Sequence, residues 1–183
     1  MIININDINE GDLRVHFEDT ADHFPVLAEM TMDGECKFMS PIITQARVFR
    51  VANLIEIEGN VETTVRLACG RCLNEYDVLL SNRYRLTYTK ELPESLIDPD
   101  QSDIELTAEE MGLILFKGES IDIRDALQEQ IVMAIPQRPL CSPSCKGLCP
   151  TCGKDLNEGD CGCRKESFGT LYDALKDFKV EKK

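Results

Sequence analysis

The sequence lacks any segment that would carry the chain into or across a membrane. Its first residues, MIININDINEGD, have neither the basic start nor the apolar core of an export signal. No apolar run approaches the roughly 20 residues that a membrane-spanning helix needs. These absences predict a protein of the reducing cytoplasm that has no membrane partner.

The sequence also has fewer basic than acidic residues. The chain has 20 Lys and Arg against 33 Asp and Glu, which gives a formal net charge of −13. Such a balance argues against a broad phosphate-binding surface. The negative charge is concentrated in residues 1–44 and 91–137, whereas residues 45–90 and 138–183 each carry a small positive excess. We therefore expect an acidic body, with either a less negative region where the last two segments meet or a solvated surface of mixed charge there.

Motifs that would indicate an enzyme are absent as well. The sequence has no nucleophile elbow and no phosphate-binding glycine loop. We interpret His16 and His23 as ordinary surface residues, and the isolated Cys36 as a small side chain without a role. The sequence thus favours a protein that is not an enzyme.

Cysteine, in contrast, is concentrated in two places. Eight of the nine cysteines form one Cys-x-x-Cys pair and one short run of six, namely Cys69, Cys72, Cys141, Cys145, Cys149, Cys152, Cys161 and Cys163. Four thiolates make the closed tetrahedral shell of a structural zinc site, so eight predict two zinc ions. In a reducing compartment, spacings of this kind indicate metal ligands more often than disulfides.

The spacing favours one division of the eight ligands. The last four cysteines are close enough in sequence to form a site of their own, which leaves the first two of the run to join the Cys69–Cys72 pair. That second site would staple segments about seventy residues apart. In CPTCG, Pro150 stiffens the turn and Gly153 permits a left-handed conformation, as in a zinc knuckle. The alternatives are a ribbon of the two Cys-x-x-Cys turns, with four cysteines unassigned, and an iron–sulfur cluster.

Hydrophobic periodicity predicts an α+β fold. Alternating apolar residues predict strands over 13–17, 61–67 and 84–88, each with one buried face. Helical spacing predicts a helix over 122–135, which Asp122 caps and the proline at position 136 ends. We expect a mainly antiparallel sheet or barrel-like body with one packed helix.

The chain is expected to divide into two domains. Residues 1–137 would form the β-rich acidic body, with an acidic, proline-containing loop over 91–110. Residues 138–183 would form a cysteine-rich zinc-knuckle module that ends in a helix. That C-terminal helix is predicted from four apolar residues at helical spacing and one candidate cap, namely Phe168, Leu171, Leu175, Phe178 and Ser167.

Three segments taken together resemble the bacterial YceD family: ACGRCLNEY, IDIRDALQEQIVMAIPQRPLC and CKGLCPTCGKDLNEGDCGC. The resemblance extends from about residue 45 to the predicted C-terminal helix, and the cysteines match the cysteine-rich version of the family. It implies a cytosolic, non-catalytic factor of ribosome biogenesis that supports accumulation of large-subunit ribosomal RNA. The implied partners are that RNA or a basic ribosomal protein, and the acidic charge slightly favours the protein.

Two other functions stay open on the residues alone. The cysteine clusters could be reactive, in a thiol redox or metal-delivery protein, or they could staple an adaptor that is unrelated to ribosomes. A thioredoxin-type pair is followed by a helix, whereas the residues after CGRC have strand-like alternation, which counts against redox use. Nothing in the sequence specifies an oligomeric state.

Overall fold

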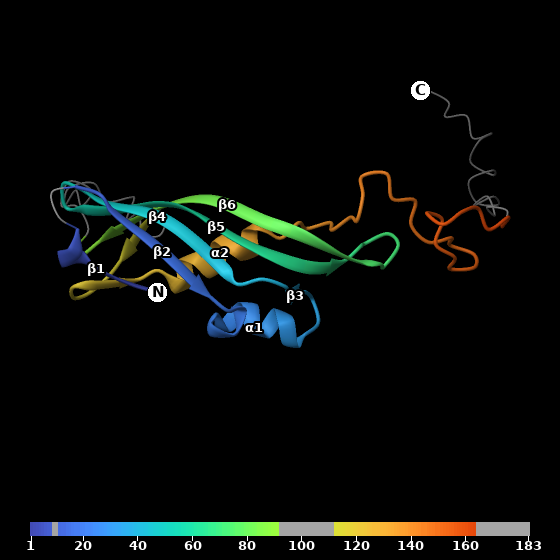
Figure 1. Ribbon diagram of the computed structural model, residues 1–183, viewed down its shortest axis with the longest axis horizontal. Coiled ribbons are helices and arrows are strands. Elements are labelled where there is room, and N and C mark those ends of the chain that lie inside the picture. Colours follow the sequence, from blue (N-terminus) through green and yellow to red (C-terminus); the bar gives the residue numbers. More distant parts are fainter. Residues whose placement is uncertain (9–10, 92–111, 164–183) are drawn as a thin grey trace, which may run out of the picture.

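The structure is a computed structural model, and it describes residues 1–8, 11–91 and 112–163. An elongated sheet dominates it, with the strand order β2–β4–β5–β6–β7 and β3 beside β5 (Figure 1). Its strands are β2 (Leu13–Asp19), β3 (Lys37–Phe38), β4 (Ile42–Val51), β5 (Leu54–Ala68), β6 (Glu75–Thr89) and β7 (Leu113–Leu115). All neighbours are antiparallel except β6 and β7. The predicted antiparallel sheet is confirmed.

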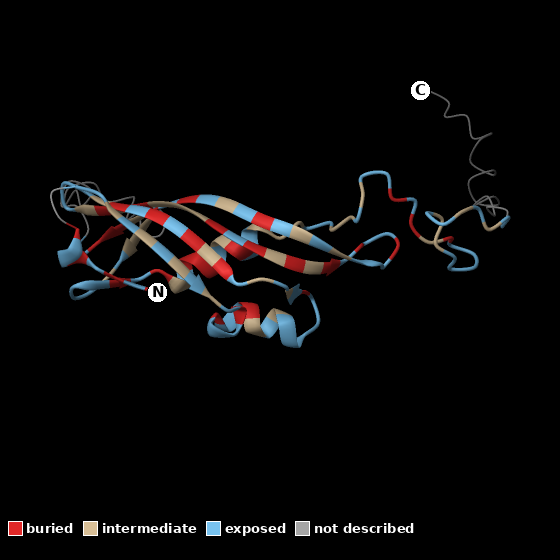
Figure 2. Ribbon diagram, in the orientation of Figure 1, coloured by how far each residue is buried: buried red, intermediate tan, exposed pale blue. Residues whose placement is uncertain are grey.

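The strands alternate between a buried and an outward face, as their sequences predict. On β5, Ile57, Val61 and Val65 are buried, while Glu58 and Glu62 lie on the opposite face. Figure 2 shows this alternation along the sheet. Among the strands that the structure describes, β2 and β7 end the sheet without pairing to each other, so the sheet is open and the barrel-like alternative is wrong.

A smaller sheet and two short turns complete the body. Strand β1 (Ile2–Asn4) pairs with β8 (Ser120–Asp122), and the turns are the 3-10 helices η1 (Ile5–Asp7) and η2 (Ala21–His23). The backbone N–H of Ile5 donates to the carbonyl of Glu119 at 2.9 Å, which ties the start of the described chain to β8.

Two α-helices cover the buried face, where the sequence patterns predicted one. Helix α1 (Pro25–Met32) was not predicted, although Pro at the first helical position is a helix-start signal. Helix α2 (Arg124–Ala134) corresponds to the expected helix over 122–135. Leu27 of α1 and Leu127 of α2 are fully buried and join the two helices to one core.

The ends of α2 differ slightly from prediction, for identifiable reasons. Asp122 is the last residue of β8, so Ile123 is the N-cap residue and the predicted cap position is wrong by one. The Asp122 carboxylate still accepts a hydrogen bond from the backbone N–H of Arg124 at 3.0 Å. At the other end, Ile135 is extended because a residue before proline disfavours the helical conformation.

Two predicted features lie outside the described residues. They are the acidic loop over 91–110, apart from its first residue, and the C-terminal helix. The division into domains at residue 137 stays a prediction.

One glycine permits the close packing of the three central strands. Gly59 of β5 pairs with Ala46 of β4 on one side and with Tyr84 of β6 on the other. A Cβ at this position would lie 2.6 Å from the Tyr84 hydroxyl and 2.7 Å from the carbonyl oxygen of Gln45. The Tyr84 hydroxyl is hydrogen-bonded to the buried Thr44 hydroxyl at 2.8 Å, so the ring is held over the glycine. Glycine within a strand often marks such an approach.

We expect Gly59→Ala to lower the free energy of unfolding by about 1–3 kcal/mol, because the added methyl group overpacks the sheet. Urea denaturation followed by circular dichroism measures this change. Gly11→Ala is the matched control, since a Cβ there meets nothing within 4 Å. Equal midpoints for the two variants would contradict the close packing at Gly59.

Candidate metal centre

The first group of cysteines is assembled where a hairpin meets the cysteine-rich segment (residues 138–163). Strands β5 and β6 each have 15 residues, and the turn between them carries Cys69 and Cys72. The cysteine-rich segment passes this turn at the end of the long sheet (Figure 1). The backbone N–H of Gly70 donates to the carbonyl of Pro139 at 2.8 Å, which holds the segment against the hairpin.

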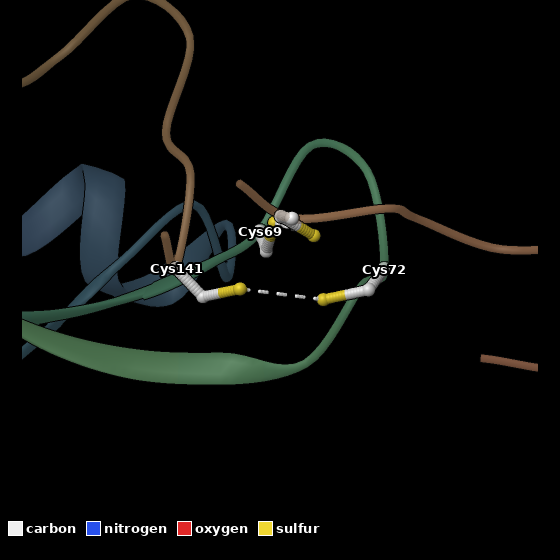
Figure 3. Close-up of side chains that lie close together, drawn as sticks. Cys69, Cys72 and Cys141 are labelled. Atoms are coloured by element: carbon white, nitrogen blue, oxygen red, sulfur yellow. Dashed lines mark hydrogen bonds between the residues drawn. The ribbon is translucent and has the colours of Figure 1, made fainter. Parts of the chain in front are cut away.

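Four sulfur atoms converge at this turn, and we call the group the hairpin site. It consists of Cys69, Cys72, Cys141 and Cys145, whose Sγ atoms all lie within 4.8 Å of one another. The Sγ atoms of Cys69 and Cys145 are 3.8 Å apart. Those of Cys72 and Cys141 are 3.6 Å apart, and the dashed line in Figure 3 joins them.

These separations fit a metal ion better than a disulfide. Zn–S bonds of about 2.3 Å place the sulfur atoms of a tetrahedral site about 3.8 Å apart. A disulfide would bring two sulfur atoms to about 2.0 Å, and all nine cysteines are free thiols. The donor set and its dimensions could therefore hold a metal ion.

The hairpin site is largely shielded from water. Cys69, Cys72 and Cys145 are buried, and Tyr76, Leu140 and Leu148 pack against them, while Cys141 is exposed. The Arg71 guanidinium donates from Nη1 to the carbonyl of Cys145 at 2.8 Å and so joins the hairpin turn to the ligand loop. This packing fixes the sulfur atoms in place.

The remaining cysteines form a second group, which we call the loop site. It consists of Cys149, Cys152, Cys161 and Cys163, and its Sγ atoms also lie within 4.8 Å of one another. Gly153 has a φ of 74°, and its N–H donates to the carbonyl of Cys149 at 2.8 Å, as a knuckle-type turn requires. The structure thus brings together the same two groups of four that the spacing favoured.

The thiols of both sites have displaced pKa values. Hydrogen bonds from backbone N–H groups lower the pKa of the Cys69 thiol to about 6, and they have the same effect on Cys149. Hydrogen bonding to a neighbouring cysteine raises the pKa of Cys141 to about 12, and likewise that of Cys163. Four adjacent thiolates repel one another unless a cation lies between them, so each site is a donor set that a divalent metal ion would stabilise.

Asn157 links the two sites. It belongs to the loop between Cys152 and Cys161, yet its side-chain Nδ2 donates to the Cys145 sulfur of the hairpin site at 3.4 Å. Its Oδ1 accepts from the backbone N–H of Lys146 at 2.8 Å. Groups that hydrogen-bond metal ligands orient them and tune their affinity. The loop site therefore supplies part of the environment of the hairpin site.

Asp155 supports this connection from the same loop. It accepts hydrogen bonds from the Asn157 side chain at 2.7 Å and from Asn74 of the hairpin turn at 2.8 Å. The backbone N–H of Leu148 also donates to the carbonyl of Arg71 at 3.1 Å. The sequence patterns did not identify these polar residues, because their partners lie far away in the chain. The only local signal was the short DLN segment, in which Asp155 accepts from the backbone N–H of Asn157.

We expect Asn157→Ala to weaken metal retention at the hairpin site about 10–100-fold, the usual effect of removing a group that hydrogen-bonds a ligand. Titration of the metal-loaded protein with a chelator would measure the loss. Asn53→Ala, the same substitution in the turn between β4 and β5, is the control. If the two variants release metal at the same chelator concentration, Asn157 does not support the site.

Comparison with known proteins places this arrangement in a family. The family model described as "Large ribosomal RNA subunit accumulation protein YceD" matches residues 57–179, which include both cysteine sites. The chain belongs to the YceD family. The resemblance seen in the sequence motifs is thereby confirmed, and the family is named for accumulation of the large ribosomal RNA subunit.

Three individual relatives share between 24% and 31% sequence identity with this chain. The chain is similar to the chloroplastic large ribosomal RNA subunit accumulation protein YCED homolog 1 of Arabidopsis thaliana, with 24% identity over 74% of this chain and 48% of the relative. The Zea mays homolog is 24% identical over 92% of this chain and 63% of the relative. An uncharacterised protein of Mycobacterium tuberculosis is 31% identical over 60% of this chain and 49% of its own length. The chain thus spans between 48% and 63% of the length of these relatives.

No solved structure matches this chain. Within the part of the chain that the structure describes, neither helix has the length and apolar character to cross a bilayer.

Proposed function

We propose that this YceD-family chain is a non-enzymatic factor of ribosome biogenesis that supports accumulation of large-subunit ribosomal RNA. In this proposal its eight clustered cysteines hold two structural zinc ions, and it works in a reducing compartment such as the cytoplasm. The observation that carries the proposal is the family match over residues 57–179, which spans the hairpin and both cysteine sites.

The zinc assignment rests on the chemistry of the donor atoms and on a coordination shell that four protein ligands complete. All four donors at each site are cysteine sulfurs, which suit zinc or an iron–sulfur cluster. Structural zinc sites have four protein ligands and no open position. The sulfur separations of 3.6 and 3.8 Å in the hairpin site fit one zinc ion at its centre. Such an ion would connect the hairpin to the cysteine-rich segment and contribute directly to folding.

Local structure counts against the redox alternative. In thioredoxin-type proteins, a helix N-terminus follows the first cysteine and stabilises its thiolate. Here the chain continues from Cys72 into strand β6, and Cys69 and Cys72 each lie beside a cysteine of the distant segment. This arrangement supports a structural use of the thiols.

Charge pairing on the outward face of the sheet favours a protein partner over RNA. Arg47 contacts Asp12 at 3.1 Å and Glu58 at 3.2 Å, and Arg66 contacts Asp77 at 2.6 Å. Arg85 also forms an ion pair with Glu58 and, through its hydrogen bonds, lowers the pKa of that carboxyl group. These arginines are already neutralised by carboxylates, so they do not form a free basic face for RNA phosphates. We therefore propose that the partner is a basic ribosomal protein.

We expect the purified protein to contain about two zinc ions per chain and to react slowly with thiol reagents, because coordinated thiolates are protected. Elemental analysis with a thiol titration tests this. Cys69→Ser together with Cys145→Ser should reduce the content to about one ion, whereas Cys36→Ala, a change at the buried cysteine outside both sites, should leave it unchanged. A metal-free protein with a readily formed Cys69–Cys72 disulfide would refute the structural sites.

The proposed cellular role predicts specific binding partners. We expect a tagged chain to co-purify with proteins or RNA of the large ribosomal subunit, and its depletion to lower large-subunit RNA relative to small-subunit RNA. Quantitative RNA measurement and mass spectrometry provide the readouts. If neither ribosomal RNA nor ribosomal proteins co-purify, a zinc-stapled adaptor unrelated to ribosomes becomes the better description.

A further inference from the structure

The hairpin turn contains a bulky residue in an unfavourable backbone conformation. Leu73 follows Cys72 directly and has a φ of 62°, in the left-handed region. Among the described residues other than glycine, only Ala52, in the turn between β4 and β5, also has a positive φ. Left-handed geometry is energetically unfavourable for a residue with a Cβ, and glycine avoids most of this cost.

The loop site shows how the same turn is built without that cost. There Gly153 follows Cys152, and its N–H donates to the carbonyl of Cys149 at 2.8 Å. In the hairpin site the N–H of Leu73 donates to the carbonyl of Cys69 at 2.9 Å. The two turns are equivalent, so the knuckle requires the left-handed conformation at this position. It does not require a leucine side chain there.

Packing does not explain the leucine. Leu73 is 66% exposed in the described structure, although the cysteines on either side of the turn are buried. Removal of a buried leucine side chain from water would stabilise the fold enough to offset the backbone cost. An exposed one gains little. Leucine at a position where glycine would avoid the strain is a reason to look for a functional contact.

We propose that Leu73 is the apolar anchor of a contact surface at the hairpin tip, and that this surface binds a basic protein. The inference rests on the proposed function and names the part of the molecule that performs it. The partner would place an apolar pocket over Leu73 and basic side chains around it. Buried apolar anchors encircled by polar contacts are the usual source of affinity in protein interfaces.

Local charge favours a basic protein over RNA at this tip. Residues 69–77 and 138–163 contain four basic and five acidic side chains. Each site of four thiolates and one zinc ion would add a charge of about −2, by charge counting. With both ions bound, these two segments would carry a net negative charge, which would repel phosphates and attract lysine and arginine. A leucine side chain also offers neither a ring for base stacking nor a hydrogen-bond donor.

The test compares three variants of the zinc-loaded chain of 183 residues. Leu73→Gly removes the side chain and the backbone cost, Leu73→Ala removes most of the side chain and keeps the cost, and Leu115→Ala is the control. Leu115 lies on β7, beside the end of β6 that is far from the turn, and it is 53% exposed. The probes are the proteins stripped by high salt from purified large ribosomal subunits and, separately, the ribosomal RNA of the same particles.

We expect the unmodified chain and Leu115→Ala to retain a basic ribosomal protein that mass spectrometry identifies. Both Leu73 variants should bind that purified protein at least tenfold more weakly, as loss of an interface anchor does. Zinc content should be unchanged, and Leu73→Gly should resist urea at least as well as the unmodified chain, because the backbone cost is gone.

Other outcomes overturn the inference in distinguishable ways. Equal binding by all variants would show that Leu73 is not a contact, while leaving the proposed function intact. Retention of RNA but no protein would refute the partner class. A marked loss of urea resistance in Leu73→Gly would show that Leu73 packs within its own chain. Retention of neither probe by the unmodified chain would count against the proposed function itself.

Discussion

Mutual repulsion among closely spaced thiolates is the constraint on which the arrangement at the hairpin tip depends. Four sulfur atoms within 4.8 Å of one another cannot all ionise side by side without a cation, and a divalent ion that relieves the repulsion also joins two distant parts of the chain. The hydrogen bonds from Gly70 to Pro139 and from Leu148 to Arg71 lie around this cluster. Without a cation, the hairpin and the segment would still be joined by these bonds and by those from Arg71 to Cys145 and from Asn74 to Asp155.

The two cysteine sites form a continuous unit. Asn157 reaches from the loop of one site to a sulfur atom of the other, and Asp155 of that loop accepts from Asn74 of the hairpin turn. Order in the loop site therefore positions groups that support the hairpin site. If both sites bind metal, loss of the ion from the loop site would weaken retention of the ion at the hairpin site.

Local patterns in the sequence were sufficient to predict much of this fold. Alternation identified the strands on either side of the Cys-x-x-Cys turn, and helical spacing identified α2, because both reflect which face is buried. Helix α1 was missed because it is only eight residues long and weakly amphipathic, with Leu27 its one buried residue. The roles of Gly59 and Asn157 depend on partners brought together by strand register and by metal-site geometry. Spacing along the chain contains no information about either.

The length of the hairpin sets the electrostatic environment of its tip. Fifteen paired residues at about 3.4 Å each extend for roughly 50 Å, whereas charges in physiological salt are screened over about 8 Å. A molecule that approaches the tip therefore experiences the charges of the turn and of the cysteine sites, and almost none of the charge at the opposite end of the sheet. The hairpin acts as a spacer, so the overall acidity of the chain influences its solubility more than its choice of partner.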